Sequence, residues 1–160
     1  MADGSFSMGG NFMTEISTYK SRTGKLSCSG KEFYDFVTDI RNFERFISPD
    51  ILSNLKTEKD SLSFQVNMLG TVNIRIIEKT MYNKVVYKGE TLQVEDFSLI
   101  IDVPDPGKGN TEVNITLEAE INPMLKMVAA GPVKRFLETL IDEMEKYKGW
   151  KDTKEQNQFL

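Results

Sequence analysis

Residues 112–123, EVNITLEAEINP, carry the clearest structural signal in the chain. Apolar residues occupy every second position from Val113 to Ile121, and polar or charged residues stand between them. This period of two predicts a β-strand with one buried face and one solvated face. Asn122 and Pro123 then supply a helix N-cap and a first helical residue that needs no hydrogen-bond donor. The stretch therefore predicts a strand that leads directly into a helix.

The alternation extends back along the chain from Ile121 to Leu55. Turn residues, such as Leu69-Gly70, Tyr82-Asn83 and the segment 104–110, separate the alternating runs. We therefore predict a meander of five or six short antiparallel strands, with one apolar face covered and one face in water. The inward residues are expected to include Phe64, Val66, Met68, Val72, Ile74, Tyr87, Phe97, Leu99, Ile101, Val113, Ile115 and Leu117.

An apolar stripe at helical spacing follows Pro123 and predicts a long C-terminal helix. Pro132 within it removes the hydrogen bond to the Val128 carbonyl, so we expect a kink or a short break there. Gly149 is expected to stop the helix, and residues 149–160 are expected to form a polar tail. The stripe consists of Leu125, Val128, Val133, Phe136, Leu137, Leu140, Ile141 and Met144.

The chain before the meander predicts one strand and two short helices. Residues 1–13, rich in glycine and serine at their start, are expected to be a flexible leader, and residues 14–26 a first strand. Ser29 to Glu32 has the S-x-x-E pattern of a capping box, and Asp39 can cap the second helix. The apolar faces of the two helices are expected to carry Phe33, Phe36, Val37, Ile40, Phe43 and Phe46.

This order of elements resembles the helix-grip fold of the START-like superfamily (SRPBCC), which includes the birch-pollen-allergen proteins and the polyketide cyclase/dehydrase group. Residues 33–43, FYDFVTDIRNF, look like the superfamily's first helix and the start of its second. Residues 122–127, NPMLKM, look like the start of the last helix in small bacterial members. The resemblance covers residues 14–148. It implies an α+β domain in which a curved antiparallel sheet wraps around a long C-terminal helix.

The resemblance also implies a cavity between sheet and helix that holds an apolar molecule such as a lipid, a sterol or a polyketide. Some members of the superfamily are cyclases and others are co-chaperones. We therefore expect binding or transport of a small hydrophobic ligand. The alternatives are an enzyme of the polyketide cyclase/dehydrase type and a co-chaperone-like protein-interaction module. A closed apolar cavity would favour carriage, converging polar groups would favour catalysis, and a filled core would favour the interaction module.

Residue counts exclude several other classes of protein. The 160 residues fit one domain. Without histidine and with a single cysteine, the chain has no Ser-His-Asp or Cys-His nucleophile system, no zinc site of the usual type and no internal disulfide. The net charge of −4 and the lack of a basic cluster argue against nucleic acid. With no apolar run of about 18–20 residues and no export signal, we expect a cytoplasmic protein without cofactor or metal.

The candidate ligand-binding residues come from the inward sheet face, the two short helices and the C-terminal helix. Core packing explains any single sheet residue, but as a set these residues face one narrow helix. Phe36 and Phe43 either gate the mouth of a cavity or seal the core, and Met127 either adapts to a ligand or fills a gap. The full set is Arg22, Phe36, Phe43, Phe64, Val66, Met68, Ile74, Tyr87, Phe97, Leu99, Val113, Ile115, Leu117, Met127, Phe136 and Leu140.

Polar candidates are few. Arg22 shares strand parity with Ile16, so an unbroken first strand would point its guanidinium inward, toward a ligand carboxylate or phenolate. A bulge at Gly24 would instead leave Arg22 on the surface. Tyr87 is either the general acid of a cyclase or a buried tyrosine with one hydrogen-bond partner. Cys28 is expected to be a packed residue, because no histidine can activate its thiol.

Overall fold

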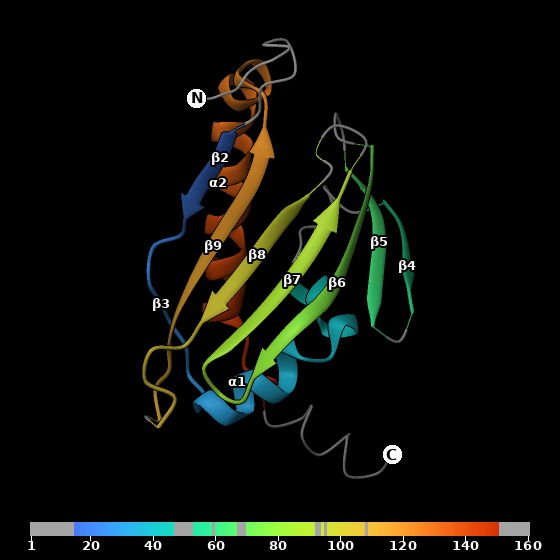
Figure 1. Cartoon of the computed structure of the whole chain (residues 1–160). Helices are drawn as coiled ribbons and strands as arrows, with labels where there is room; N and C mark the ends of the chain where they lie inside the picture. The colour runs from blue at the N-terminus through green and yellow to red at the C-terminus, as the bar shows by residue number, and fades with distance from the viewer. Residues whose placement is uncertain are drawn as a thin grey trace.

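The computed structural model describes residues 15–46, 53–58, 60–66, 70–91, 94, 96–107 and 109–150. The predicted leader and residues 151–160 of the predicted tail lie outside these ranges. Within them, eight strands form one antiparallel sheet in the order β2-β9-β8-β7-β6-β5-β4, with β3 also paired to β9 (Figure 1). The strands are β2 (Glu15–Lys20), β3 (Gly24–Lys25), β4 (Ser53–Thr57), β5 (Ser61–Val66), β6 (Gly70–Thr80), β7 (Lys84–Glu90), β8 (Phe97–Asp102) and β9 (Glu112–Ile121).

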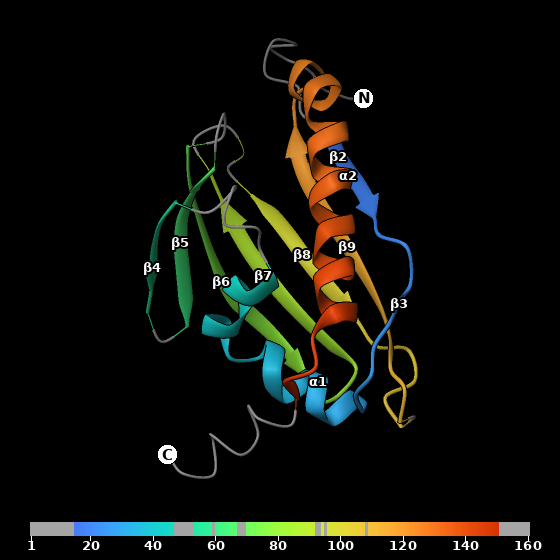
Figure 2. The same cartoon turned by 180° about the vertical axis from the view of Figure 1, so that it is seen from behind.

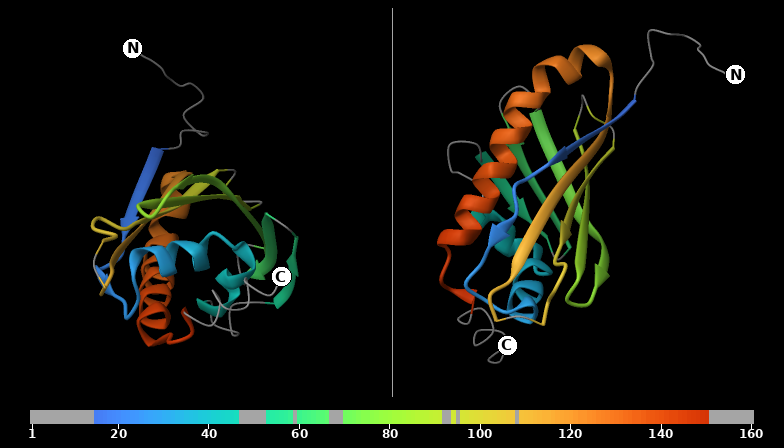
Figure 3. Two further views of the ribbon diagram at one scale, coloured as in Figure 1. Left: turned by 90° about the horizontal axis from the view of Figure 1, so that it is seen from below. Right: turned by 90° about the vertical axis from the view of Figure 1, so that its left-hand side faces the viewer.

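One long helix, α2 (Pro123–Lys146), covers the concave side of this sheet (Figure 2). It contacts β2, β3 and β9, the strands at one side of the sheet. Its buried residues are Leu137, Leu140, Ile141 and Met144, which belong to the stripe predicted from the sequence. The predicted α+β helix-grip architecture is therefore confirmed, with a curved sheet wrapped around a C-terminal helix (Figure 3).

Two of the three predicted helix caps, Ser29 and Asn122, begin α-helices in the structure. The Ser29 hydroxyl accepts from the Glu32 backbone N–H at 3.1 Å, and the Glu32 carboxylate accepts from the Ser29 N–H at 3.0 Å. This capping box begins α1 (Gly30–Val37). The Asn122 side chain accepts from the Leu125 N–H at 2.8 Å and begins α2. These bonds satisfy amide groups that have no partner within the first helical turn.

Three details of the helices differ from the predictions. The second short helix is a 3₁₀ helix, η2 (Ile40–Phe46). Helix α2 passes through Pro132 without the short break that was one of two expectations, and its axis turns near the N-terminal end (Figure 3). It also ends at Lys146 with Tyr147 as C-cap, three residues before the glycine expected to stop it.

The sheet closes at one end with a set of packed rings, which we call the aromatic cluster: Phe33, Phe36, Phe46, Tyr147 and Trp150. Ring centroids of Phe36 lie 4.9 Å from those of both Tyr147 and Trp150. Trp150 is only 2% exposed, so its placement in a polar tail was wrong. The polar residues around Trp150 hid a side chain that packs against α1 and η2.

Candidate functional site

The strand register aligns the inward residues of the sheet into rows that cross from strand to strand. One row runs Tyr19, Leu117, Leu99, Tyr87 and Ile76. The next runs Ser17, Ala119, Phe97, Gly89, Ile74 and Leu62. Helix α2 contacts the β2 and β9 side of the same sheet. The second row contains three small residues, Ser17, Ala119 and Gly89, which sequence reasoning did not include in the candidate site.

Position 89 requires glycine because the ring of Phe97 packs directly over it. A Cβ atom at Gly89 would stand 2.3 Å from Cζ of Phe97 and 2.7 Å from Cγ2 of Ile74. No real side chain tolerates such distances, so a larger residue would displace the Phe97 ring. The position of Phe97 over the sheet thus depends on a glycine two strand positions beyond Tyr87.

Most predicted lining residues are buried. Those with exposed fractions below one tenth are Phe36, Phe43, Phe64, Ile74, Tyr87, Leu99, Val113, Ile115, Leu117 and Leu140. Phe97 and Phe136 are partly exposed. The side chains of Val66 and Met68 lie outside the described part of the structure. Met127 is 83% exposed on the first turns of α2, so its placement in the lining is wrong in this structure.

Nine partly exposed hydrophobic residues pack against the buried core. Apart from Tyr34, Ala130 and Tyr147, they form a group of six that we call the half-covered set. Three come from the sheet and three from α2. The members are Leu55, Ile76, Phe97, Leu125, Val133 and Phe136. Both the sheet and α2 therefore keep apolar surface that the core does not cover.

Phe36 and Phe43 lie in the interior of the two short helices. Phe36 belongs to the aromatic cluster, and the Phe43 ring centroid lies 5.3 Å from that of Tyr87. In this arrangement they seal one end of the sheet. Opening of these helices as a gate stays a prediction.

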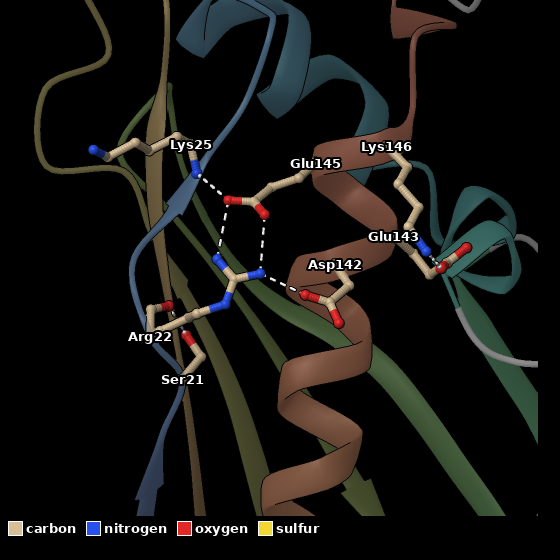
Figure 4. A network of polar contacts seen from close by, with 7 residues as sticks. All are labelled: Ser21, Arg22, Lys25, Asp142, Glu143, Glu145 and Lys146. Atoms are coloured by element: carbon tan, nitrogen blue, oxygen red, sulfur yellow. Dashed lines mark hydrogen bonds and ion pairs between the residues drawn. The ribbon is translucent and has the colours of Figure 1, made fainter.

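Arg22 points away from the interior. Its guanidinium donates to both carboxylate oxygens of Glu145, at 3.0 and 2.9 Å, and to Asp142 at 2.5 Å (Figure 4). Its side chain is 41% exposed. Of the two orientations that the sequence left open for Arg22, the structure therefore shows the surface one, and its placement in the cavity lining is wrong. β2 ends at Lys20 and buries Ser17 and Tyr19, so Arg22 follows a break in the strand.

This ion-pair cluster fastens the segment between β2 and β3 to the last turns of α2. The Lys25 backbone N–H also donates to Glu145, at 2.9 Å (Figure 4). Hydrogen bonds from Arg22 and from the Lys25 N–H lower the pKa of Glu145 to about 2. The ionised carboxylate is thus favoured in the folded protein.

We expect Arg22→Ala to lower the free energy of unfolding by about 1 kcal/mol at pH 7, a small value because water screens these partly exposed charges. The pKa of Glu145 is lower in the folded chain than in the unfolded one. Its contribution is therefore present above about pH 4.5 and declines as the pH falls toward 2. Urea unfolding at pH 7 and pH 2.5 should show a smaller cost at low pH. Lys146→Ala, which loses one 3.4 Å ion pair to Glu143, is the control. If Arg22→Ala and Lys146→Ala lowered the free energy of unfolding equally at pH 7, the prediction would be contradicted.

Tyr87 is fully buried, and its hydroxyl donates to the Val37 carbonyl at an O···O distance of 2.5 Å. Burial raises the pKa of this phenol. A phenol that already donates to a backbone carbonyl has its proton committed to that bond. Of the two interpretations of Tyr87, the geometry supports the structural hydrogen bond that ties β7 to the end of α1.

Two hydroxyls that sequence reasoning missed lie on the inward face of β2. Ser17 is 4% exposed and Tyr19 is 7% exposed, whereas the neighbouring Ile16 is 66% exposed. Neither the Ser17 Oγ nor the Tyr19 OH has a hydrogen-bond partner within the part of the chain that the structure describes. The sequence prediction took Ile16 as an inward residue and therefore placed Ser17 and Tyr19 on the outward face. The neighbouring pairs Ser17–Ala119 and Tyr19–Leu117 show the true orientation, which needs the strand register.

Other polar features offer less. Burial raises the pKa of Cys28 to about 12, as befits a packed thiol. An open hollow of about 500 Å³ lies between the α1–η2 junction and the β4–β5 hairpin, lined by Thr38, Asp39, Arg41, Thr57, Glu58 and Asp60. Arg41 and Asp39 are already paired there, at 2.9 and 2.7 Å. Among the described residues, no three Asp, Glu, Cys or His side chains gather as metal ligands do. No helix in the same ranges is long and apolar enough to span a bilayer.

Comparisons with known proteins give fold likeness without sequence likeness. No protein-family model and no curated protein matches the sequence. Norcoclaurine synthase from Thalictrum flavum superposes with a TM-score of 0.64 at 13% identity, over 91% of this chain and 98% of that chain. Another of its structures is a complex with dopamine and hydroxybenzaldehyde.

Bacterial structures are similar to the same degree. A protein from Thermus thermophilus has a TM-score of 0.60 at 12% identity, over 81% of this chain and 95% of that chain. A protein from Rhizobium loti has a TM-score of 0.58 at 12% identity, over 82% of this chain and 99% of that chain. At these identities the likeness concerns the fold alone. The chain has the helix-grip fold, with the open antiparallel sheet and long C-terminal helix that these structures share.

Proposed function

We propose that this protein binds and carries a small hydrophobic molecule between its curved sheet and helix α2. The observation that carries the proposal is the half-covered set, which brings exposed apolar surface from the sheet and from the helix to one core. Small-molecule sites are mostly apolar, with a few polar groups that fix the orientation of the ligand. The likeness to norcoclaurine synthase supports the proposal, because that fold also forms a complex with two small molecules.

The other two functions considered from the sequence have less support. A cyclase of the predicted kind would use Arg22 and Tyr87 on the substrate carbonyl, but Arg22 is bound to Asp142 and Glu145 outside the core. Tyr87 is bound to Val37. A co-chaperone-like module would use the outer sheet face, which displays the alternating polar residues of β9. Membership of the START-like superfamily and a cytoplasmic location remain predictions from the sequence.

Binding of Nile red, a neutral solvatochromic dye, tests the proposal. We expect its emission to shift to the blue with saturable dependence on protein concentration, because apolar surroundings replace water. Val133→Trp adds bulk within the half-covered set and should weaken Nile red binding at least tenfold, provided circular dichroism shows a folded protein. Lys134→Trp places the same side chain at the adjacent exposed position of α2 and should change affinity less than twofold.

Two outcomes would contradict the proposal. The first is the absence of saturable Nile red binding to the folded wild-type protein. The second is equal affinity of the folded Val133→Trp and Lys134→Trp proteins, because the dye would then bind elsewhere. If Val133→Trp does not fold, Leu125→Trp, at another member of the half-covered set, takes its place with the same control.

A further inference from the structure

Two of the three hydroxyls on β2 are buried without a hydrogen-bond partner among the described residues. Ser17 and Tyr19 lie two residues apart on the same strand face, and both the Ser17 Oγ and the Tyr19 OH are buried and unpaired. Water bonds such groups in the unfolded chain, so burial without a partner costs stability. Alanine in place of Ser17 and phenylalanine in place of Tyr19 would fill nearly the same space without that cost.

Their position adjoins the half-covered set. Ser17 pairs across the strands with Ala119, and Ala119 pairs with Phe97, which is a half-covered residue. Tyr19 pairs with Leu117 in the next row. Two other buried groups among the described residues also lack partners, Thr111 Oγ1 and Trp150 Nε1. Those two come from separate elements, at the start of β9 and beyond α2, whereas the hydroxyls of β2 form a pair on one face of the sheet.

No charged side chain among the described residues is buried in the core with this pair. In the described part of the chain, the buried polar residues are Ser17 and Thr111, and neither is charged. Arg22, the cation nearest to β2 in sequence after Lys20, faces Asp142 and Glu145 instead. A carboxylate placed beside Ser17 and Tyr19 would lose its hydration without gaining a cation.

We propose that Ser17 and Tyr19 recognise an uncharged hydrogen-bonding group, a hydroxyl or a carbonyl, on an otherwise apolar ligand. This inference rests on the proposed function and specifies its ligand class. A hydroxyl on each side chain can donate to a carbonyl, or accept from and donate to a hydroxyl. The class replaces the acidic ligand that an inward Arg22 would have required.

Three probes with one aromatic body separate the possibilities: 2-naphthol, 2-methylnaphthalene and 2-naphthoate, which is ionised at pH 7. Their affinities are measured by displacement of Nile red. The variants are Ser17→Ala and Tyr19→Phe, each of which removes one unpaired hydroxyl and little else. The matched control is Thr18→Ala, which removes an exposed hydroxyl from the opposite face of the same strand.

In the wild type we expect 2-naphthoate to bind at least tenfold more weakly than 2-naphthol. The preference for 2-naphthol over 2-methylnaphthalene should fall about three- to tenfold in each variant, the range for one neutral hydrogen bond, and stay within twofold in Thr18→Ala. The urea midpoint of ligand-free Tyr19→Phe should equal or exceed that of the wild type, because no bond is lost.

The outcomes also separate this inference from the proposed function. Binding of all three probes with an unchanged preference in both variants overturns the role of the hydroxyls and leaves ligand binding intact. Preferred binding of 2-naphthoate overturns the uncharged ligand class. A lower urea midpoint of Tyr19→Phe shows that the hydroxyl has a partner within the protein and also overturns the inference. Failure of Nile red itself to bind contradicts the proposed function.

Discussion

Replacing Trp150 with alanine should lower the free energy of unfolding by about 3–5 kcal/mol, the usual cost of deleting a buried large aromatic side chain. Trp150 is 2% exposed, and its ring meets Phe33, Phe36, Phe46 and Tyr147. The segment after α2 has little other apolar material to replace this contact. Loss of the ring leaves a void between α1, η2 and the end of α2.

Urea unfolding followed by far-ultraviolet circular dichroism measures this cost, since Trp150 is the only tryptophan and cannot report on its own absence. Trp150→Phe is the matched control. It keeps an aromatic ring and discards the Nε1–H group, which has no hydrogen-bond partner among the described residues, so it should cost less than half as much as alanine. A cost below about 1 kcal/mol for Trp150→Ala would show that the segment after α2 is not part of the core.

The sequence alone predicted the parts of the fold that local chemistry determines. The period of two from Val113 to Ile121 marked β9, and Asn122 with Pro123 marked the start of α2, as the structure confirms. The Ser29 and Glu32 capping box is also present. Each of these signals lies within about ten residues, so no knowledge of distant contacts was needed.

The site was harder to predict because it depends on register between distant strands. Ile16 suggested one inward face of β2, yet pairing with β9 buries Ser17 and Tyr19 and exposes Ile16. A shift of one residue reverses every side chain of a strand, so the same parity offered an inward orientation for Arg22 as one of two alternatives. The hydrogen bonds of Arg22 to α2 join residues more than 100 positions apart.

The local sequence pattern also could not predict which residues near the two ends of α2 are exposed and which are buried. Val128 belongs to the apolar stripe of α2, yet it is exposed, as is Met127 beside it, whereas Trp150 lies beyond the helix and is buried. Helical spacing says which residues share a face, and it does not say how far along the helix the sheet extends. All four of the buried side chains of α2 lie in its C-terminal half.

Replacing Tyr87 with phenylalanine should lower the free energy of unfolding by about 1–3 kcal/mol near pH 8, because the Val37 carbonyl loses a donor inside the core. The ring itself remains packed against Phe43, so little of the cost comes from apolar contacts. This expectation follows from a structural role for Tyr87. Tyr82→Phe, at a half-buried tyrosine in the turn after β6, is the control and should cost less than about 0.5 kcal/mol.

The cost of Tyr87→Phe should also depend on pH in one direction. Burial raises the pKa of Tyr87 in the folded protein above its ordinary value of 10. Above pH 10 the unfolded phenol ionises while the folded phenol keeps its proton, so the wild type loses up to about 1.4 kcal/mol per pH unit that phenylalanine does not lose. Urea unfolding at pH 8, 10 and 11 should therefore show the gap between the two proteins narrowing as the pH rises. A gap that stays constant or widens would mean that the Tyr87 phenol reaches solvent and is free to exchange its proton, as a catalytic acid must.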